Sequence, residues 1–255
     1  MTGSVLIERR ERRGGVTVVT LNRPEQANAL NAAVRAGIRE AFVAFEADED
    51  AHIAVLAANG SRAFCAGADL KEMATTGLGV PPRDFVPPID RLTSKPVVAA
   101  AKGAAHAGGF LLVQMCDLCV AAEEASFAIT EARWGRGAPW AVPLAAMVPQ
   151  RIMMELLLTA KPIDAKRAYE VGLVNRVVPR GELPEAAVEL AEEIARLAPL
   201  TVRAHRRLVY LAGELGCRTA LDAAAGLFQH VYSSEDAQEG PRAFAEKRPP
   251  VWKGR

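Results

Sequence analysis

The chain has 255 residues and half of them are apolar, so it is long enough to bury a large core without disulfide staples. Its 31 Lys and Arg residues balance 30 Asp and Glu residues, and this net charge of +1 gives no general reason to expect nucleic acid or an anionic membrane as a partner. No apolar stretch approaches the ~18 residues that span a bilayer, and the N-terminal residues turn charged after a short apolar run, so we expect a cytoplasmic protein.

The N-terminal elements begin with a predicted β-hairpin. Residues 5–21 form two alternating apolar runs around Gly14 and Gly15, which is the pattern of two antiparallel strands joined by a tight turn. Four arginines lie near that turn: Arg9, Arg10, Arg12 and Arg13. We interpret them as a solvated hairpin end, with nucleic-acid binding as the weaker alternative.

A polar loop over residues 22–31 leads into a predicted amphipathic helix. Its apolar positions recur at helical spacing, at Val34, Ile38, Ala41, Phe42 and Phe45. The sequence then predicts a buried strand over 53–58 and a turn through Gly67 into a short helix. Residues 75–88 are rich in Gly and Pro and predict a loose loop that can cover a site.

Strand and helix patterns then alternate. Residues 95–103 predict a strand, 107–115 a helix and 117–122 another strand, and this alternation favours βα crossover units. From Glu131 onward the pattern is mostly helical, with breaks at Gly172, Pro184 and Pro199.

The four cysteines are too few for a disulfide scaffold in a chain of this length. Cys116 and Cys119 form a C-x-x-C pair, but a zinc site needs further ligands at suitable spacing, and a redox motif needs its own βα context. We therefore expect ordinary buried thiols here, and no metal.

The stretch AHAGGFLLVQMCD, residues 105–117, is the strongest local signal for a ligand site. Gly108 and Gly109 open an apolar helix, where unpaired backbone N–H groups and the positive end of the helix dipole favour an anion. The alternative is that the glycines only permit close helix packing. Chemistry at such a site usually needs an ionisable group one turn further on, and there the chain has Leu111.

Six segments, in this order, carry a family resemblance: NRPEQANALN (22–31), AFCAGADLKEM (63–73), KPVVAAAKGAAHAGG (95–109), MCDLCVAAEEASF (115–127), KPIDAKRAYEVGLVNRVVP (161–179) and SSEDAQEGPRAFAEKRPPVW (233–252). With them the chain resembles the crotonase family, the enoyl-CoA hydratase/isomerase superfamily. The resemblance implies an α/β fold with a β-β-α spiral core over residues 1–195 and a helical trimerisation region over 196–255. It also implies a homo-trimer or a dimer of trimers, with an acyl-CoA thioester as ligand and coenzyme A only as part of that substrate.

Enolate chemistry beside a thioester carbonyl needs preorganised donors for the developing oxyanion. The resemblance places one donor at the backbone N–H of Ala68, in a turn that Gly67 makes tight, and the other at Gly108.

The resemblance also assigns a wall that holds the thioester and the adenine end of coenzyme A, made of Ala66, Ala68, Asp69, Leu70 and Lys71. Arg23 is implied to lie near the same nucleotide, where it can pair with phosphate. Taken alone, Arg23 and Lys71 are ordinary surface cations.

Hydratases of this family hold a water between two glutamates. The resemblance places the second at Glu131, at a helix start, whereas the first falls on Leu111. Loss of one positioned acid–base group typically costs ~10²–10⁴-fold in rate, which argues against efficient hydration. One carboxylate suffices for a 1,3-proton shift, and the family's Δ3,Δ2-enoyl-CoA isomerases keep an acid at the Glu131 place alone. The alternative for Glu131 is a structural residue favoured by the helix dipole.

Two further departures border the predicted acyl pocket. Trp140 and Arg136 stand where the family often has a glycine-rich turn, and the indole of Trp140 can reshape the cavity. His106 either faces the site or is a hydrogen-bonded packing residue, and we favour packing. The sequence therefore predicts an acyl-CoA enzyme that favours isomerisation, with a catalytically silent acyl-CoA-binding homologue as the alternative.

Overall fold

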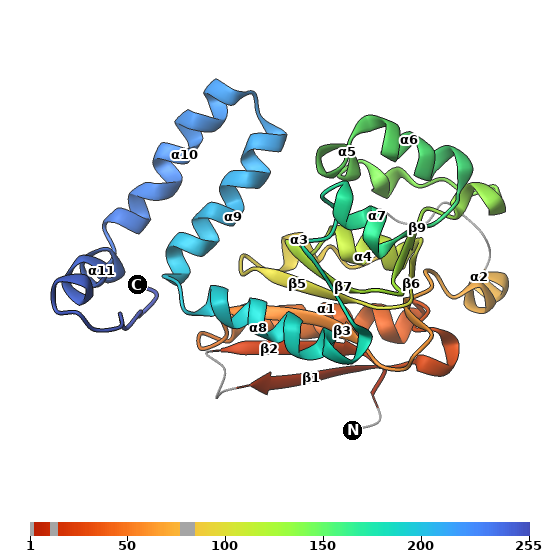
Figure 1. Ribbon diagram of the computed structural model, residues 1–255, viewed down its shortest axis with the longest axis horizontal. Helices are drawn as coiled ribbons and strands as arrows, with labels where there is room; N and C mark the ends of the chain where they lie inside the picture. Colours follow the sequence, from red (N-terminus) through yellow and green to blue (C-terminus); the bar gives the residue numbers. More distant parts are fainter. Residues whose placement is uncertain (1–2, 11–14, 77–84) are drawn as a thin grey trace.

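The computed structural model describes residues 3–10, 15–76 and 85–255 and has two sheets with helices around them (Figure 1). The six-stranded sheet has the order β1 (Val5–Arg10), β2 (Val16–Leu21), β3 (Ile53–Ala58), β5 (Val97–Ala101), β7 (Leu118–Ala122) and β10 (Arg176–Val178). The antiparallel pairing of β1 with β2 confirms the predicted hairpin, and the other neighbours are parallel. Arg12 and Arg13 lie outside the described residues. Arg9 pairs with Asp48 and Asp50.

A second sheet of short strands lies beside the first. Its order is β4 (Ala63–Cys65), β6 (Ala104–His106), β8 (Ser126–Ala128) and β9 (Ile163–Asp164), and the first three are parallel. Three strands of the six-stranded sheet, β3, β5 and β7, are each followed by a short strand and then by a helix: α2 (Leu70–Thr76), α4 (Gly108–Gln114) and the 3-10 helix η3 (Glu131–Trp134), respectively. This arrangement is the β-β-α spiral that the family resemblance implies.

Along β2, β3, β5 and β7, successive side chains point to opposite faces of the sheet, and each face packs against its own apolar core. On one face, α1 (Ala32–Ala47) buries the five apolar residues that the sequence predicted, and α3 (Ile89–Leu92) packs beside it. On the other face, α8 (Leu183–Ala195) crosses the sheet and packs Ala187 and Ala191 on its valines (Figure 1).

New helices begin at the predicted breaks at Pro184 and Pro199. Pro184 lies in the first turn of α8, and Pro199 is the first residue of α9 (Pro199–Glu214). Proline is tolerated there because the first N–H groups of a helix have no intrahelical partner.

Short helices complete the body: η2 (Pro24–Gln26), η4 (Pro139–Ala141), α5 (Leu144–Met147), α6 (Gln150–Thr159), α7 (Ala165–Glu170) and η5 (Arg180–Glu182). The chain then leaves the body through α9, α10 (Cys217–Tyr232) and α11 (Glu235–Ala245), which extend away from both sheets (Figure 1). The guanidinium of Arg206 on α9 donates to both oxygens of Asp117, at 2.8 and 2.9 Å, and ties this helix to the body.

All four cysteines are free, and Cys116 and Cys119 are buried. Burial raises the pKa of the Cys119 thiol to about 12, so this C-x-x-C pair consists of unreactive packing residues. Across the described ranges, no His, Cys, Asp and Glu side chains gather in a group that could hold a metal ion. In the same part of the chain, none of the helices has the length and apolar character to cross a bilayer.

Candidate functional site

Three parallel strands of the second sheet bring the predicted catalytic positions to one edge. Ala68 follows β4, Gly108 follows β6 and Glu131 follows β8. The register pairs Cys65 with Ala105, and His106 with Ala128, so the three carboxyl ends lie side by side. Gly108 is therefore flanked by Ala68 on one side and Glu131 on the other. In open α/β sheets, this edge is where ligands bind.

The first turn, residues 66–69, is fixed by its neighbours. Gly67 has a φ of +101°, and a Cβ on it would lie 2.7 Å from the Cβ of Ala107. The Gly67 carbonyl accepts from the N–H of Leu30 at 2.8 Å, and the Ala66 N–H donates to the Ala27 carbonyl at 3.0 Å. The backbone N–H of Ala68 has no such acceptor among the described residues.

The second turn, residues 107–109, is equally constrained. Ala107 adopts φ 50° and ψ −122°, a conformation that side chains disfavour and that costs about 1–3 kcal/mol. A Cβ on Gly109 would lie 2.0 Å from the carbonyl oxygen of Cys65, so only glycine fits there. The N–H of Gly108 stands at the start of α4 with no backbone acceptor in the described part of the chain.

The two turns touch each other. A Cβ on Gly67 would lie 3.3 Å from the nitrogen of Gly108 and 2.7 Å from the Cβ of Ala107, and the second contact is too short for any residue but glycine. Two N–H groups that have no backbone acceptor among the described residues thus come from adjacent turns. Paired backbone N–H donors can stabilise an oxyanion in acyl-transfer and enolate chemistry when both face it.

Glu131 places a half-buried carboxylate beside these turns. Its Oε1 accepts a hydrogen bond from Trp140 Nε1 at 3.1 Å. Its Oε2 is buried and has no hydrogen-bond partner among the described residues. Burial raises the pKa of this carboxyl above its ordinary value, although the hydrogen bonds that it accepts act in the opposite direction. A group with these properties is suited to take up and return a proton.

Leu111 lies one turn after Gly108 on α4, is only 7 % exposed and belongs to the apolar core. The position thus supplies no acid, as the sequence indicates. Burial there also means that an acid at residue 111 would enter an apolar environment.

The residues predicted to form the coenzyme A wall lie in a turn and in the first residues of α2. Ala66, Leu70 and Lys71 are exposed. Asp69 accepts from the N–H groups of Lys71 and Glu72 and so caps the helix. Burial opposes its ionisation, but these bonds and the guanidinium of Arg23 hold the pKa of Asp69 below its usual range.

Arg23 is held in place by the protein itself. Its Nη1 donates to Asp69 at 3.1 Å and to the carbonyl of Ala29 at 2.9 Å. This cation thus braces the Asp69 turn. His106 forms a 3.0 Å hydrogen bond with Ser126, and burial, aided by Arg133, lowers its pKa, as fits the packing interpretation.

Asn28 is a residue of the site that sequence reasoning missed. It is 1 % exposed and adopts φ +54°; its amide donates to the carbonyls of Asn59 and Ala63, both at 3.0 Å. These bonds fix the segment that pairs with the 66–69 turn. Asparagine tolerates this left-handed conformation, but that preference alone does not reveal the role.

At the edge of the spiral core the fold thus places two N–H groups that have no backbone acceptor among the described residues, together with one partly desolvated carboxylate. Comparison with known proteins gives the family. Residues 11–255 match the family described as Enoyl-CoA hydratase/isomerase. The chain is 39 % identical, over 96 % of its length and 97 % of the relative's, to a carnitinyl-CoA dehydratase of Salmonella typhi.

Solved structures agree with this match. An enoyl-CoA hydratase from Mycobacterium tuberculosis H37Rv superposes with a TM-score of 0.91 at 36 % identity, covering 99 % of each chain. An enoyl-CoA hydratase from Mycobacterium marinum superposes with a TM-score of 0.92 at 36 % identity, again over 99 % of both chains. The chain belongs to the enoyl-CoA hydratase/isomerase family, and it is an enzyme of that family with the crotonase fold.

Proposed function

We propose that this enzyme moves a proton between C2 and C4 of an acyl-CoA thioester, with Glu131 as its single acid–base group. The observation that carries the proposal is the asymmetry of the site. Glu131 has one buried carboxylate oxygen with no partner among the described residues, whereas Leu111 supplies only an apolar side chain. A 1,3-proton shift needs one such group, and addition of water across a double bond is best served by two.

The reaction begins with a 3-enoyl thioester whose carbonyl oxygen accepts from the N–H groups of Ala68 and Gly108. Glu131 takes a proton from C2, and the electron pair of that C–H bond delocalises into the thioester carbonyl and the double bond. The two N–H groups stabilise the resulting dienolate oxyanion. Glu131 then returns the proton at C4, which gives the 2-enoyl thioester and restores the carboxylate.

The coenzyme A part of the substrate is proposed to lie along residues 66–71. Exposed Ala66 and Leu70 offer apolar contact, and exposed Lys71 offers a cation to phosphate. Asp69 shapes this wall by capping α2, and Arg23 keeps Asp69 in place. Trp140 borders the acyl side next to Glu131. A cytoplasmic location stays a prediction.

A screen over 2-enoyl, 3-enoyl and 3-hydroxyacyl thioesters tests the proposal. We expect conversion of a 3-enoyl-CoA to exceed hydration of the matching 2-enoyl-CoA. The name of the carnitinyl-CoA dehydratase relative refers to water chemistry, so faster dehydration of a 3-hydroxyacyl-CoA is the result that would overturn the isomerase preference. Deuterium entering C2 of a bound saturated acyl-CoA separates an active base from a silent binder, which gives no exchange.

Leu111→Glu is expected to raise hydration of a short 2-enoyl-CoA above that of the parent, because it restores a second carboxylate one turn after Gly108. The buried position makes the variant less stable, since a carboxylate among apolar neighbours loses hydration. Leu111→Gln is the matched control, since it adds a polar side chain of the same size without an acid. Equal hydration by both folded variants would mean that pocket geometry excludes water chemistry.

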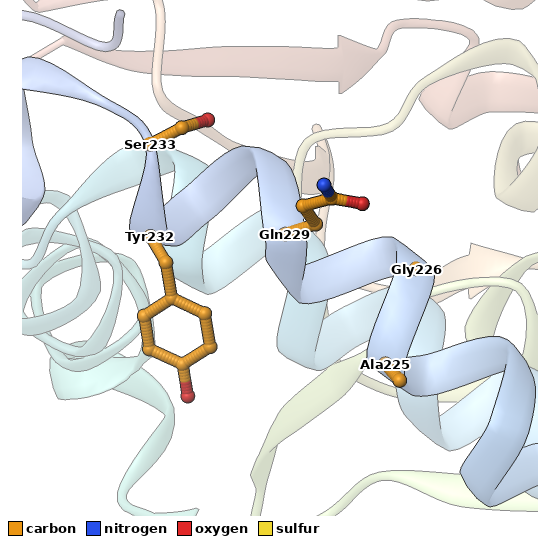
Figure 2. A pocket seen from close by; sticks show the side chains of 5 residues that line it. All are labelled: Ala225, Gly226, Gln229, Tyr232 and Ser233. Carbon is orange, nitrogen blue, oxygen red and sulfur yellow. The ribbon is translucent and has the colours of Figure 1, made fainter.

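We also propose that the C-terminal helices join copies of this chain into a trimer or a dimer of trimers. Apolar side chains on these helices are exposed, including Val209, Leu221, Tyr232 and Phe244. Figure 2 shows a pocket on α10 lined by Ala225, Gly226, Gln229, Tyr232 and Ser233. Closed symmetric assembly would cover such surfaces.

Light scattering at micromolar concentration is expected to give a mass well above the 27.2 kDa of one chain. Gly226→Arg is expected to weaken assembly and leave the fold intact, because nothing in the single chain lies within 4 Å of a Cβ at Gly226. Gly181→Arg, which is equally open but lies on η5, serves as the control. A parent that scatters as a monomer contradicts this assembly.

A further inference from the structure

After Glu131 the chain turns back, and this turn brings the indole of Trp140 next to the Glu131 carboxylate. After η3 the backbone turns at Gly135, which has a φ of +61°, and the Arg136 N–H donates to the Glu131 carbonyl at 3.0 Å. Pro139 then starts η4 and restricts the backbone before residue 140. Trp140 packs half-buried against the main core, with its Nε1 3.1 Å from Glu131 Oε1.

This hydrogen bond makes the two oxygens of the Glu131 carboxylate inequivalent. An indole N–H is a donor only, so the oxygen that faces it must act as an acceptor in both protonation states of the carboxyl. The carbonyl-type oxygen of a protonated carboxyl is the stronger acceptor, so the indole favours the proton on Oε2, which is buried and has no partner among the described residues. A hydrogen bond to one of the two oxygens also restricts rotation of the carboxyl group.

We propose that Trp140 is the positioning residue of the catalytic base: its indole N–H holds Oε1 of Glu131 and directs proton transfer to Oε2. This inference rests on the proposed function, because it acts through Glu131. It assigns to Trp140 a role distinct from shaping the acyl pocket.

Among the hydrogen bonds of the described residues, the side-chain donor to the Glu131 carboxylate is the indole of Trp140. Arg133, on the same 3-10 helix, donates its Nη2 to the Ala160 carbonyl at 2.7 Å, and Arg136 contacts Glu131 through its backbone N–H. His106, at the end of the neighbouring strand, forms a hydrogen bond with Ser126, and burial and Arg133 lower the pKa of its ring. For the described residues, burial raises the pKa of Glu131, whereas its own N–H, the indole of Trp140 and the Thr130 N–H lower it.

Trp140→Phe keeps an aromatic ring and deletes the N–H. A donor to a carboxylate favours the ionised form, so its loss raises the pKa of Glu131. The acidic limb of the pH profile of kcat/KM for 3-enoyl-CoA isomerisation is therefore expected to move to higher pH. We expect kcat to fall ~10-fold or more because the base loses its orientation, while KM changes little.

The matched control is Trp134→Phe, the same chemical change at a side chain that is 65 % exposed on the adjacent 3-10 helix. We expect it to keep the parental pH profile. A Trp140→Phe profile that coincides with the parental one overturns the proposal. Failure of this proposal can be told apart from failure of the proposed function, because the proposed function fails when Glu131→Gln keeps full turnover.

A second measurement uses the parent protein and does not require Trp140→Phe to fold. With ¹⁵N-labelled tryptophan, the indole N–H resonance of Trp140 is expected to shift with pH at the apparent pKa of the kinetic limb. That shift should vanish in Glu131→Gln, whereas the resonance of Trp134 stays constant in both proteins. A Trp140 resonance that does not titrate with Glu131 contradicts the assignment.

Discussion

Glu131→Gln is expected to lower isomerisation and C2 exchange by at least ~10²-fold while acyl-CoA binding persists. Glutamine keeps the size of the side chain and an acceptor for Trp140 Nε1, but it cannot take up a proton. Turnover with a 3-enoyl-CoA and deuterium exchange measure the loss, and calorimetric titration with a saturated acyl-CoA measures binding. Glu189→Gln, at an exposed position on α8, is the control and should retain turnover.

The raised pKa of Glu131 also predicts how the free energy of unfolding depends on pH. Burial makes its folded-state pKa higher than the unfolded value. Its stabilising contribution is therefore present below the unfolded pKa and is lost as pH rises through the folded pKa. Above that range the parent carries a partly desolvated charge that the glutamine variant lacks. We expect Glu131→Gln to melt at the parental temperature or higher at pH 8, so unfolding would not explain lost activity.

A Gln variant with parental turnover would mean that Glu131 is a structural residue and that the proposed mechanism is wrong. A variant with lost turnover and lost binding would instead place Glu131 in substrate recognition. The two readouts, kinetics and calorimetry, therefore separate an acid–base role from both alternatives.

The long elements were predictable because their burial is periodic. The helix that buries Val34, Ile38 and Phe42 carries its apolar residues at the spacing that the structure buries, and β3 reads as one apolar run. The short strands β4, β6 and β8 have three residues each, too few to give an alternating signal. Local patterns therefore missed the second sheet, and only the family resemblance implied it.

The site likewise contains residues that sequence motifs predict and contacts that depend on the tertiary structure. The family resemblance predicts roles for Ala68, Gly108 and Glu131 through motifs that run along the chain. The bond between Trp140 and Glu131 spans nine residues of irregular backbone, and the pairing of Arg23 with Asp69 spans 46. No spacing rule relates such positions, because the turns at Gly135 and Pro139 determine where the indole returns. The sequence identified Trp140 as bulky and near the pocket, but its polar contact depends on tertiary structure.

Gly108→Pro is expected to lower turnover by ~10²–10³-fold, because it deletes one of the two N–H groups that are proposed to face the enolate oxygen. Proline is tolerated at the first position of a helix, so α4 loses no internal hydrogen bond. The added Cβ meets the Leu30 Cδ1 at 2.9 Å, the end of a flexible side chain. Gly108→Ala adds the same Cβ and keeps the N–H, so comparison of the two variants isolates the donor.

Proline also restricts the residue before it, and Ala107 has a φ of 50° that a following proline disfavours. Replacing Gly108 by glycolic acid avoids this restriction, since the resulting ester removes the N–H without adding a side chain. We expect the ester to lose turnover as the proline variant does and to bind a saturated acyl-CoA nearly as the parent does, because the oxyanion forms only during reaction. An ester protein with parental turnover would show that the Gly108 N–H does not stabilise the enolate, and the oxyanion donors would then have to be sought elsewhere than at the start of α4.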